Sequence, residues 1–494
     1  MSSKRLVRLG DGENCLAPMV YFLVLFIVSA FVKVVYYNIG VIPNWSVLGE
    51  RILKIVPGLA ICCAVGLIWK RLAILYYVIY LAILISSLIL LGHIHLFGVP
   101  FNAESAVAVL VTNFSEASQF VRSFVVIRDV VVFCVIAVFS VMFLRYVKKG
   151  VVRIFERPRV RRDYLLGFIV LALATGWINK YRVPLRELPF DELRKIMSSA
   201  LADLRAVKEL EDGADVEVSV ASDVPRVLVL VIGESINKHH MGVYGYYRDT
   251  TPRLNSIDEK IVWKNVVSAA PTTFKSVGMM LTLRNLENDF YGTTVLRVAQ
   301  KAGYKTWWLS SQGVTQKLGH GIVNVIANDA DATYNVSKRE DGRVYDGDVL
   351  PPLRHALKDP ATLKFIVIHT LGSHTAYAER VPPEWNGCAF GEPELKKELL
   401  MDGVAIDIDR VKSIVNAYDC SVLYTDYVLF QIWEEIKKQD IAAGLFFVGD
   451  HGEEVFDSEP RFGHAGSAKS RYVYEVPMIF LMNSGYREFL GSLG

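Results

Sequence analysis

A carboxylate and an imidazole stand side by side in the stretch LFFVGDHGEE, where Asp450 and His451 follow a run of apolar residues. Glu234 ends a second apolar run, RVLVLVIGES, and His369 and His374 lie in a third, LKFIVIHTLGSH. Oxygen and nitrogen donors without cysteine suit zinc or manganese. A buried ion pair could explain one of these stretches alone, but three well-separated segments together indicate a metal site.

A candidate nucleophile lies in the segment NVVSAAPTTFKSVGMMLTLRN, where Thr272 and Thr273 precede a predicted helix. A hydroxyl at a helix N-terminus lies near free N–H groups and the positive end of the helix dipole, which favour a phosphate group. A bound metal could make this hydroxyl a nucleophile by stabilising its alkoxide. On the residues alone, one threonine could equally be a helix N-cap, so both interpretations stay open.

The elements that must position these side chains are short apolar runs, which recur from residue 224 onward and end in small or polar residues. Longer amphipathic segments, such as TTVLRVAQKAG and TDYVLFQIWEEIKK, separate them. This alternation predicts an α/β domain over residues 224–494, with a mainly parallel central sheet covered on both faces. Ligands bind beyond the carboxyl ends of such strands, so the candidate metal ligands should share one edge of the sheet.

The N-terminal part of the chain is far more apolar. Five runs are each close to the length that a helix needs to cross a bilayer, and they cover residues 19–41, 52–69, 72–92, 123–146 and 164–180. Their apolar residues lie on every face, and five such helices in succession would leave none to cover a soluble core. The sequence therefore predicts a transmembrane domain with five helices over 1–180, followed by a bridging helix or linker over 181–223.

Basic residues mark every second loop of this part. Lys4, Arg5 and Arg8 precede the first run, Lys70 and Arg71 separate the second from the third, and RYVKKGVVRIFERPRVRRD joins the fourth to the fifth. Since basic loops stay in the cytoplasm, the N-terminus is predicted to be cytoplasmic and residues 224–494 to lie across the membrane. The net charge of +3 argues against a nucleic-acid partner, and no segment indicates an obligatory protein partner.

Four stretches together resemble the membrane-bound phosphoethanolamine transferases of Gram-negative bacteria, within the alkaline phosphatase/sulfatase superfamily. They are VLVIGESINKHHMGVYGYYRDTTPRL, HTLGSHTAY, NAYDCSVLYTD and VGDHGEE. The resemblance covers the whole chain. It implies a multi-pass protein of the bacterial inner membrane, with a periplasmic catalytic domain of the sulfatase/alkaline phosphatase type.

The resemblance also implies a site with one tightly bound zinc ion, for which Mn²⁺ is less suitable. The zinc ligands that it implies are Glu234, Asp450, His451 and Thr273. Thr273 is then the catalytic nucleophile, with Thr272 as the alternative. His374 and His464 match family histidines that bind the phosphoryl group or a second zinc ion.

One further feature follows from the resemblance, and another follows from the predicted topology. In AVLVTNFSEASQF, Thr112 and Glu116 match residues that contact the lipid head group, whereas Ala108 departs from the family asparagine. Cys388 and Cys420 would face the oxidising side of the membrane, either as a disulfide or as two free thiols.

The chemistry implied by the resemblance is a double displacement. Thr273 takes phosphoethanolamine from phosphatidylethanolamine, and an acceptor on the lipopolysaccharide core, lipid A or a glucan then removes it. The departures from the lipid A-modifying members favour a core-oligosaccharide or glucan acceptor. A glycerol-phosphate transferase, or a phosphate or sulfate ester hydrolase, could use the same metal site. A sensor with a degenerate site is the alternative of a different class.

Overall fold

The computed structural model divides the chain into two compact units, Met1–Ala103 with Phe124–Ser199 and Glu104–Ser123 with Ala200–Gly494. The residues that it describes are 16–38, 54–97, 100–112, 117–119, 121–122, 125, 127–178, 188–210, 216–220, 224–312, 321–339, 342–385, 388, 390–395, 407–464 and 470–492.

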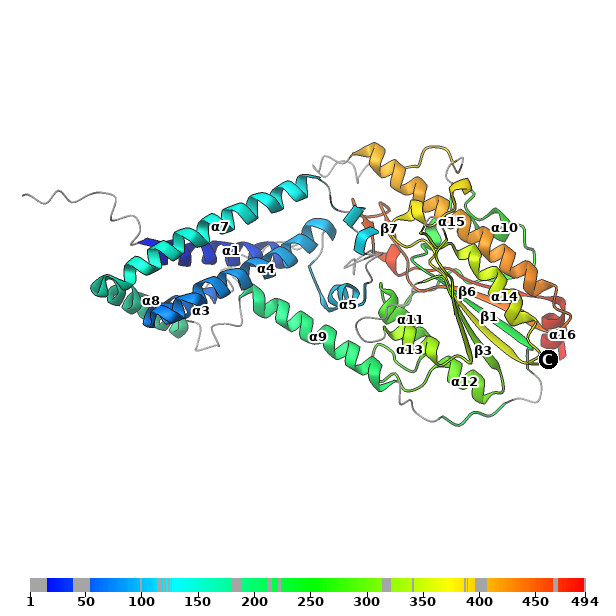
Figure 1. Ribbon diagram of the computed structural model, residues 1–494. Coiled ribbons are helices and arrows are strands. Elements are labelled where there is room, and N and C mark those ends of the chain that lie inside the picture. Colours follow the sequence, from blue (N-terminus) through cyan, green and yellow to red (C-terminus); the bar gives the residue numbers. More distant parts are fainter. Residues whose placement is uncertain are drawn as a thin grey trace, which may run out of the picture. The chain divides into compact units, whose positions relative to one another are not determined.

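The first unit is helical (Figure 1), and a helix stands at each of the five positions where an apolar run was predicted. These helices are α1 (Ala17–Asn38), α3 (Ile55–Ile68), α4 (Ile74–Phe97), α7 (Ile127–Phe155) and α8 (Pro158–Ile178). Two of them, α4 and α7, are long and apolar enough to cross a membrane, and α1 and α3 contain shorter apolar stretches. The described residues thus contain two to four apolar helices of this kind, and the number five stays a prediction.

Apolar exposure on α7 is the physical sign of a lipid-facing surface. Phe133, Val135 and Met142 are 59%, 62% and 64% exposed. In water such a surface would be unfavourable, because contiguous apolar area is kept small on soluble proteins. Tyr21 and Leu59 instead pack in the small core shared by these helices.

The second unit is built on a sheet of seven strands in the order β2-β9-β6-β1-β5-β3-β4. The strands are β1 (Val227–Gly233), β2 (Lys260–Val262), β3 (Lys305–Ser310), β4 (Ala332–Asn335), β5 (Lys364–His369), β6 (Ala443–Gly449) and β9 (Met478–Met482). Strands β6, β1, β5, β3 and β4 run parallel, whereas β9 is antiparallel to both β6 and β2. A separate antiparallel pair is formed by β7 (Glu454–Val455) and β8 (Phe462–Gly463). The prediction of a mainly parallel sheet is confirmed.

Helices cover both faces of this sheet, as Figure 1 shows. One face packs against α10 (Pro252–Asn255), α14 (Leu350–Leu357) and α15 (Ile408–Lys437). The other packs against α11 (Thr273–Leu281), α12 (Val295–Lys301), α13 (Ile322–Asn328) and the end of α9 (Pro189–Glu209). The unit also contains α5 (Ala103–Val111), which begins at the unit boundary, and α16 (Ser484–Ser492).

Alternation along β1 explains why the strand is apolar throughout. Val229 and Val231 belong to the core under α14 and α15, whereas Ile232 belongs to the core under α11 and α13. Successive side chains of a strand point to opposite faces, so a sheet covered on both sides needs an uninterrupted apolar run.

The register of the parallel strands brings their polar ends together. Gly233 of β1 pairs with Gly449 of β6, so the next residues on the two strands, Glu234 and Asp450, emerge at the same edge. On the other side of β1, Ile232 pairs with His369 of β5. The candidate site therefore lies where the sequence predicted it, at the carboxyl edge of the sheet.

Candidate metal centre

Three buried side chains converge at this edge from β1 and β6. One ligand atom each from Glu234, Asp450 and His451 lies within 4.8 Å of the others. His451 Nε2 is 3.3 Å from Glu234 Oε1 and 3.4 Å from Asp450 Oδ2. Two carboxylates and one imidazole, all fully or almost fully buried, form a donor set of the kind that zinc accepts.

Thr273 is the first helical residue of α11 and completes this group. Its Oγ1 donates a hydrogen bond of 3.0 Å to Glu234 Oε2 and lies 3.3 Å from His451 Nε2. Thr272 precedes it as the N-cap residue in an extended conformation and makes no side-chain cap hydrogen bond. The structure thus brings Thr273, and not Thr272, to the centre of the metal-ligand candidates.

The electrostatics of the group call for a cation. Burial works against ionisation of Glu234, but the hydrogen bond and charge of His451 hold its pKa well below the usual range. Burial and the charge of Glu234 raise the pKa of Asp450. Burial alone would lower the pKa of His451, yet Asp450 and Glu234 raise it. The two carboxylates therefore demand a positive charge beside them, which a divalent ion would supply.

The local hydrogen bonds leave suitable atoms for such an ion. His451 Nδ1 donates to the carbonyl oxygen of Gly452 over 2.8 Å, which turns Nε2 towards the carboxylates. Asp450 Oδ1 accepts the backbone N–H of Ser235, whereas its Oδ2 accepts no hydrogen bond from any described residue. An orphaned, buried carboxylate oxygen is costly unless it has a partner, so the residues fit a bound metal ion.

Strain at Ser235 is part of this arrangement. Its φ of 54° places a residue with a side chain in the left-handed region, directly after Glu234. The turn lets Ser235 Oγ donate to Glu234 Oε1 over 2.7 Å while its N–H reaches Asp450. The cost of this conformation is thus offset by bonds that orient both carboxylates.

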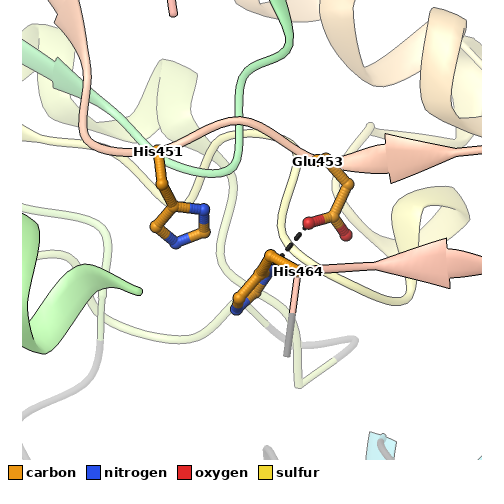
Figure 2. Close-up of side chains that lie close together, drawn as sticks. All are labelled: His451, Glu453 and His464. Atoms are coloured by element: carbon orange, nitrogen blue, oxygen red, sulfur yellow. Dashed lines mark hydrogen bonds and ion pairs between the residues drawn. The ribbon is translucent and has the colours of Figure 1, made fainter. Parts of the chain in front are cut away.

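A second cluster shares His451 and is shown in Figure 2. His451, Glu453 and His464 also have ligand atoms within 4.8 Å of one another. His464 Nδ1 lies 2.7 Å from Glu453 Oε2, and the Tyr377 hydroxyl donates to Glu453 Oε1 over 2.6 Å. Glu453 therefore orients His464, whose ring centroid is 4.1 Å from that of His451.

His374 lies at the rim of the same region, on the loop that follows β5. Its ring centroid is 5.8 Å from that of His464, and burial lowers its pKa to about 4. Asp346 fixes the start of this loop by accepting the N–H groups of Leu371 and Gly372 over 2.7 and 2.9 Å. A Cβ on Gly372 would lie 2.4 Å from the carbonyl oxygen of Glu234, so only glycine fits there.

These residues open into a cavity of about 1160 Å³, which lies entirely within the second unit. Thr273, Glu234, His374 and His464 line it together with Thr112 from the segment after α5. Thr112 is exposed and donates a hydrogen bond to the carbonyl oxygen of Ala108, which lines the cavity as well. Glu116, the other predicted head-group contact, lies outside the described residues.

An ion pair joins this segment to α11. Lys275, two residues after Thr273, forms an ion pair of 2.9 Å with Glu104. Arg380 donates to the side chain of Gln119 over 2.7 Å. Residues that lie between predicted membrane helices thus form one wall of the cavity in which Thr273 lies.

Sequence reasoning missed two residues that contact the predicted ligands. Gln312 donates from Nε2 to Glu234 Oε2 and to the carbonyl oxygen of Thr370, each over 2.9 Å. Glu453 stands within the stretch GDHGEE, which could have suggested it. Nothing about Gln312 could have done so, because it follows β3 without any chemical pattern around it.

A buried ionic network supports the site from the side of α15. His240 Nδ1 lies 2.6 Å from Asp419 Oδ1, and its Nε2 lies 3.3 Å from Asp457 Oδ2. Burial by itself lowers the pKa of His240, but Asp457 and Asp419 outweigh it and raise the pKa to about 10. Arg248 also pairs with Asp419, over 2.6 Å. His240 therefore belongs to a buried ionic network that supports the fold.

The two cysteines of this unit that the sequence left open are paired. Cys388 and Cys420 form a disulfide with their Cα atoms 5.9 Å apart. The bond joins α15 to the stretch near Gly391, whose carbonyl oxygen accepts a hydrogen bond from Arg248.

Comparison with known proteins gives three findings. Residues 226–490 match the sulfatase family. Phosphoethanolamine transferase EptC of Escherichia coli is 28% identical to this chain over 439 residues, which cover 83% of this chain and 74% of that protein. Phosphoethanolamine transferase CptA of Salmonella typhimurium is 28% identical over 438 residues, with the same shares of 83% and 74%.

Two solved structures are similar as well. The integral membrane protein lipooligosaccharide phosphoethanolamine transferase A (EptA) from Neisseria meningitidis aligns with a TM-score of 0.64 and 18% identity, covering 97% of this chain and 89% of that one. It shares the fold, including an N-terminal helical region. The C-terminal periplasmic domain of EptC from Escherichia coli, in complex with Zn, aligns with a TM-score of 0.48 and 30% identity, covering 54% and 75%.

Proposed function

Because this chain belongs to the sulfatase family, and within it to the phosphoethanolamine transferases, we propose that it transfers phosphoethanolamine from phosphatidylethanolamine to a periplasmic acceptor. The observation that carries the proposal is the position of the Thr273 hydroxyl. It lies at the N-terminus of α11, 3.0 Å from Glu234 and 3.3 Å from His451. An alcohol held beside a cation site and a helix N-terminus is suited to attack a phosphate ester.

In the first half-reaction, the Thr273 oxygen forms a bond to phosphorus while the bond from phosphorus to the diacylglycerol oxygen breaks. Glu234 accepts the hydrogen bond of the Thr273 hydroxyl and takes up its proton as the bond from oxygen to phosphorus forms. A zinc ion held by Glu234, Asp450, His451 and Thr273 would supply positive charge next to the reacting oxygens and lower the pKa of the Thr273 hydroxyl. The product of this first half-reaction is phosphoethanolamine esterified to Thr273.

Histidines have separate roles in this proposal. His464, held through Nδ1 by Glu453, has its ring beside that of His451 and gives a proton to the departing diacylglycerol oxygen. His374 is neutral because burial lowers its pKa to about 4, so it contributes a hydrogen bond to the phosphoryl group instead. A second zinc ion at His451, Glu453 and His464 is the alternative use of this cluster.

Attachment to a bilayer gives the enzyme access to its donor. We propose that five helices over residues 1–180 span the bacterial inner membrane, that 181–223 bridge, and that 224–494 form the periplasmic catalytic domain, with the N-terminus in the cytoplasm. The acyl chains of the donor then stay in the bilayer while its head group enters the cavity. Thr112, which lines that cavity, and Glu116 are the proposed head-group contacts.

The experiment uses the full-length protein in bilayers that contain phosphatidylethanolamine. We expect diacylglycerol release and, by mass spectrometry, phosphoethanolamine on the peptide that contains Thr273. Bilayers in which phosphatidylglycerol replaces that lipid should give neither product. Faster turnover of phosphatidylglycerol would favour a glycerol-phosphate transferase, and free phosphoethanolamine as the sole product at saturating acceptor would favour a hydrolase.

A further inference from the structure

The end of the cavity beside β4 carries two cationic side chains to which the function proposed above assigns nothing. Lys338 and Arg343 both line the cavity, together with Asn335, the last residue of β4. Lys338 is exposed and Arg343 is half-buried, so a molecule in the cavity has access to both. Two positive charges on the wall of a cavity attract an anion.

The backbone after β4 holds these two side chains in place. The N–H of Val336 donates to the carbonyl oxygen of Ser310 over 2.8 Å, which continues the pairing of β4 with β3. Further along, the N–H of Arg339 donates to the carbonyl oxygen of Arg343 over 2.8 Å, so the chain turns back on itself. Lys338 and Arg343 therefore lie on two neighbouring segments of one cavity wall.

Ion pairing separates another cation of this stretch from these two. Arg339 Nε lies 2.8 Å from Asp348 Oδ2, and its guanidinium lies over the ring of Tyr345, 4.6 Å from the centroid. Arg339 does not line the cavity. Among the residues that the structure describes, no acidic side chain forms an ion pair with Lys338. The charge of Lys338 is therefore available to a ligand.

The register of the sheet sets the distance between these cations and the candidate metal ligands. Ile232 of β1, His369 of β5, Ser310 of β3 and Asn335 of β4 stand side by side across the sheet. Neighbouring strands are about 4.8 Å apart, so Asn335 lies roughly 14 Å from Ile232, which stands two residues before Glu234. A ligand that reaches both ends of the cavity must extend over a similar length.

The donor does not account for the charge at the β4 end. A phosphoethanolamine group on Thr273 has its phosphate beside the candidate metal ligands, and its other end is a positively charged amine. Two cations would repel that amine. A cavity of about 1160 Å³ also has room for a ligand much larger than this group. The charge at the β4 end therefore suits the second substrate, the acceptor.

We propose that Lys338 and Arg343 select the acceptor by binding an anionic group, a phosphate or a carboxylate, that is remote from the oxygen receiving phosphoethanolamine. The proposal rests on the transferase function above and concerns its second half-reaction. There the acceptor hydroxyl oxygen forms a bond to phosphorus while the bond from phosphorus to the Thr273 oxygen breaks. The proton of the acceptor hydroxyl passes to the Thr273 oxygen, which restores the free enzyme. The two cations position the acceptor and take no part in bond making.

The test separates the two half-reactions of the full-length protein in phosphatidylethanolamine bilayers. Loading is measured as phosphoethanolamine on the Thr273 peptide without acceptor, and discharge as its loss at increasing concentrations of a probe. The probes are tetrasaccharides that differ in charge: maltotetraose is neutral, tetragalacturonic acid carries carboxylates, and maltotetraose 1-phosphate carries a phosphate. We expect an anionic probe to reach half-maximal discharge at a lower concentration than maltotetraose, and added NaCl to remove this advantage. Comparison of the two anionic probes shows which anion is preferred.

Variants then assign the effect to the cavity wall. In Lys338→Gln, the half-saturating concentration of the preferred anionic probe should rise about 2- to 5-fold, as for the loss of an exposed ion pair, and that of maltotetraose should not change. Arg343→Gln should act in the same direction, whereas Lys338→Arg keeps the charge and should stay close to the unaltered protein. Lys358, which follows α14, is exposed and does not line the cavity, so Lys358→Gln is the matched control without effect.

Equal half-saturating concentrations for the three probes would overturn the proposal, as would the absence of discharge by both anionic probes. An equal loss with maltotetraose in Lys338→Gln would also overturn it, since the lysine would then not recognise charge. Slower loading of Lys338→Gln without acceptor would show that this end of the cavity serves the donor, which contradicts the proposal as well. Failure of the unaltered protein to load Thr273 would instead refute the transferase function itself.

Discussion

Thr273 Oγ1 lies 3.0 Å from Glu234 Oε2, although the two residues are 39 positions apart in the chain. The contact exists because β1 ends at the same edge of the sheet at which α11 begins. It couples a hydroxyl to one of two buried carboxylates that lie beside the same imidazole, that of His451. The arrangement therefore favours a reaction at one atom, the Thr273 hydroxyl oxygen.

Removal of this oxygen should abolish the first half-reaction. Thr273→Ala is expected to lower diacylglycerol release by at least about 10³-fold, because no other described hydroxyl approaches both Glu234 and His451. Thr272→Ala keeps the nucleophile and should retain activity within a few-fold. Substantial turnover in Thr273→Ala would mean that the phosphoryl carrier is another residue.

Metal content should depend on Asp450. Asp450→Asn removes one charge from a fully buried cluster, so the purified protein should contain less zinc by elemental analysis and lose activity. Asp249→Asn changes an exposed carboxylate and should leave the zinc content unchanged. In the unaltered protein, chelation should abolish activity and zinc should restore it; restoration by Mg²⁺ alone would contradict a zinc site.

Stability at alkaline pH should depend on His240. Asp457 and Asp419, against the effect of burial, raise its pKa from 6.5 to about 10 in the folded protein. The folded state thus binds the proton more tightly than the unfolded state. The resulting stabilisation, on the order of a few kcal/mol, is complete below pH 6.5 and is lost as the pH rises through 10.

Thermal unfolding of the full-length protein between pH 6.5 and 10 measures this effect. The melting temperature should fall across that interval, and it should fall less in His240→Gln, which is less stable at the lower pH. The exposed His355 provides the comparison, since His355→Gln should follow the unaltered protein. Parallel curves for His240→Gln and the unaltered protein would show that another group causes the loss.

The disulfide should stabilise the second unit through its unfolded state. Cys388 and Cys420 are 32 positions apart, and closing a loop of that size contributes about 3–4 kcal/mol. Cys388→Ser should therefore lower the midpoint of urea unfolding, and reductant should do the same to the unaltered protein. Cys134, an exposed free cysteine, gives the control variant Cys134→Ser, which should behave as the unaltered protein does.

Much of the site could be predicted from the sequence because it stands at strand ends. Glu234 and Asp450 each follow an apolar run, and parallel strands place such residues at one edge. Gln312 also contacts Glu234, but an amide after a strand carries no chemical signature. Contacts between residues far apart in the chain could not be predicted for a different reason. Nothing local indicates that Glu104 meets Lys275, since the two residues are 171 positions apart in the chain.

The cysteines illustrate the same limit. Their spacing is compatible with a bond, but whether two sulfur atoms meet depends on how α15 packs beside residues 388–395. That packing depends on the buried network around Asp419, whose partners Arg248 and His240 come from a distant segment. The sequence shows which ionisable residues are present, but it does not show which of them form ion pairs in the folded protein.

The wall contributed by Glu104 and Thr112 has a consequence for how such an enzyme is studied. A shortened protein that starts at residue 200 would keep Thr273 and the candidate metal ligands but would leave Lys275 without its carboxylate partner. The cavity that contains Thr273 would be open to bulk water along one side, because Glu104 and Thr112 would no longer line it. Assays on such a fragment, with small water-soluble esters, would report the intrinsic reactivity of the threonine and say nothing about how a lipid is selected.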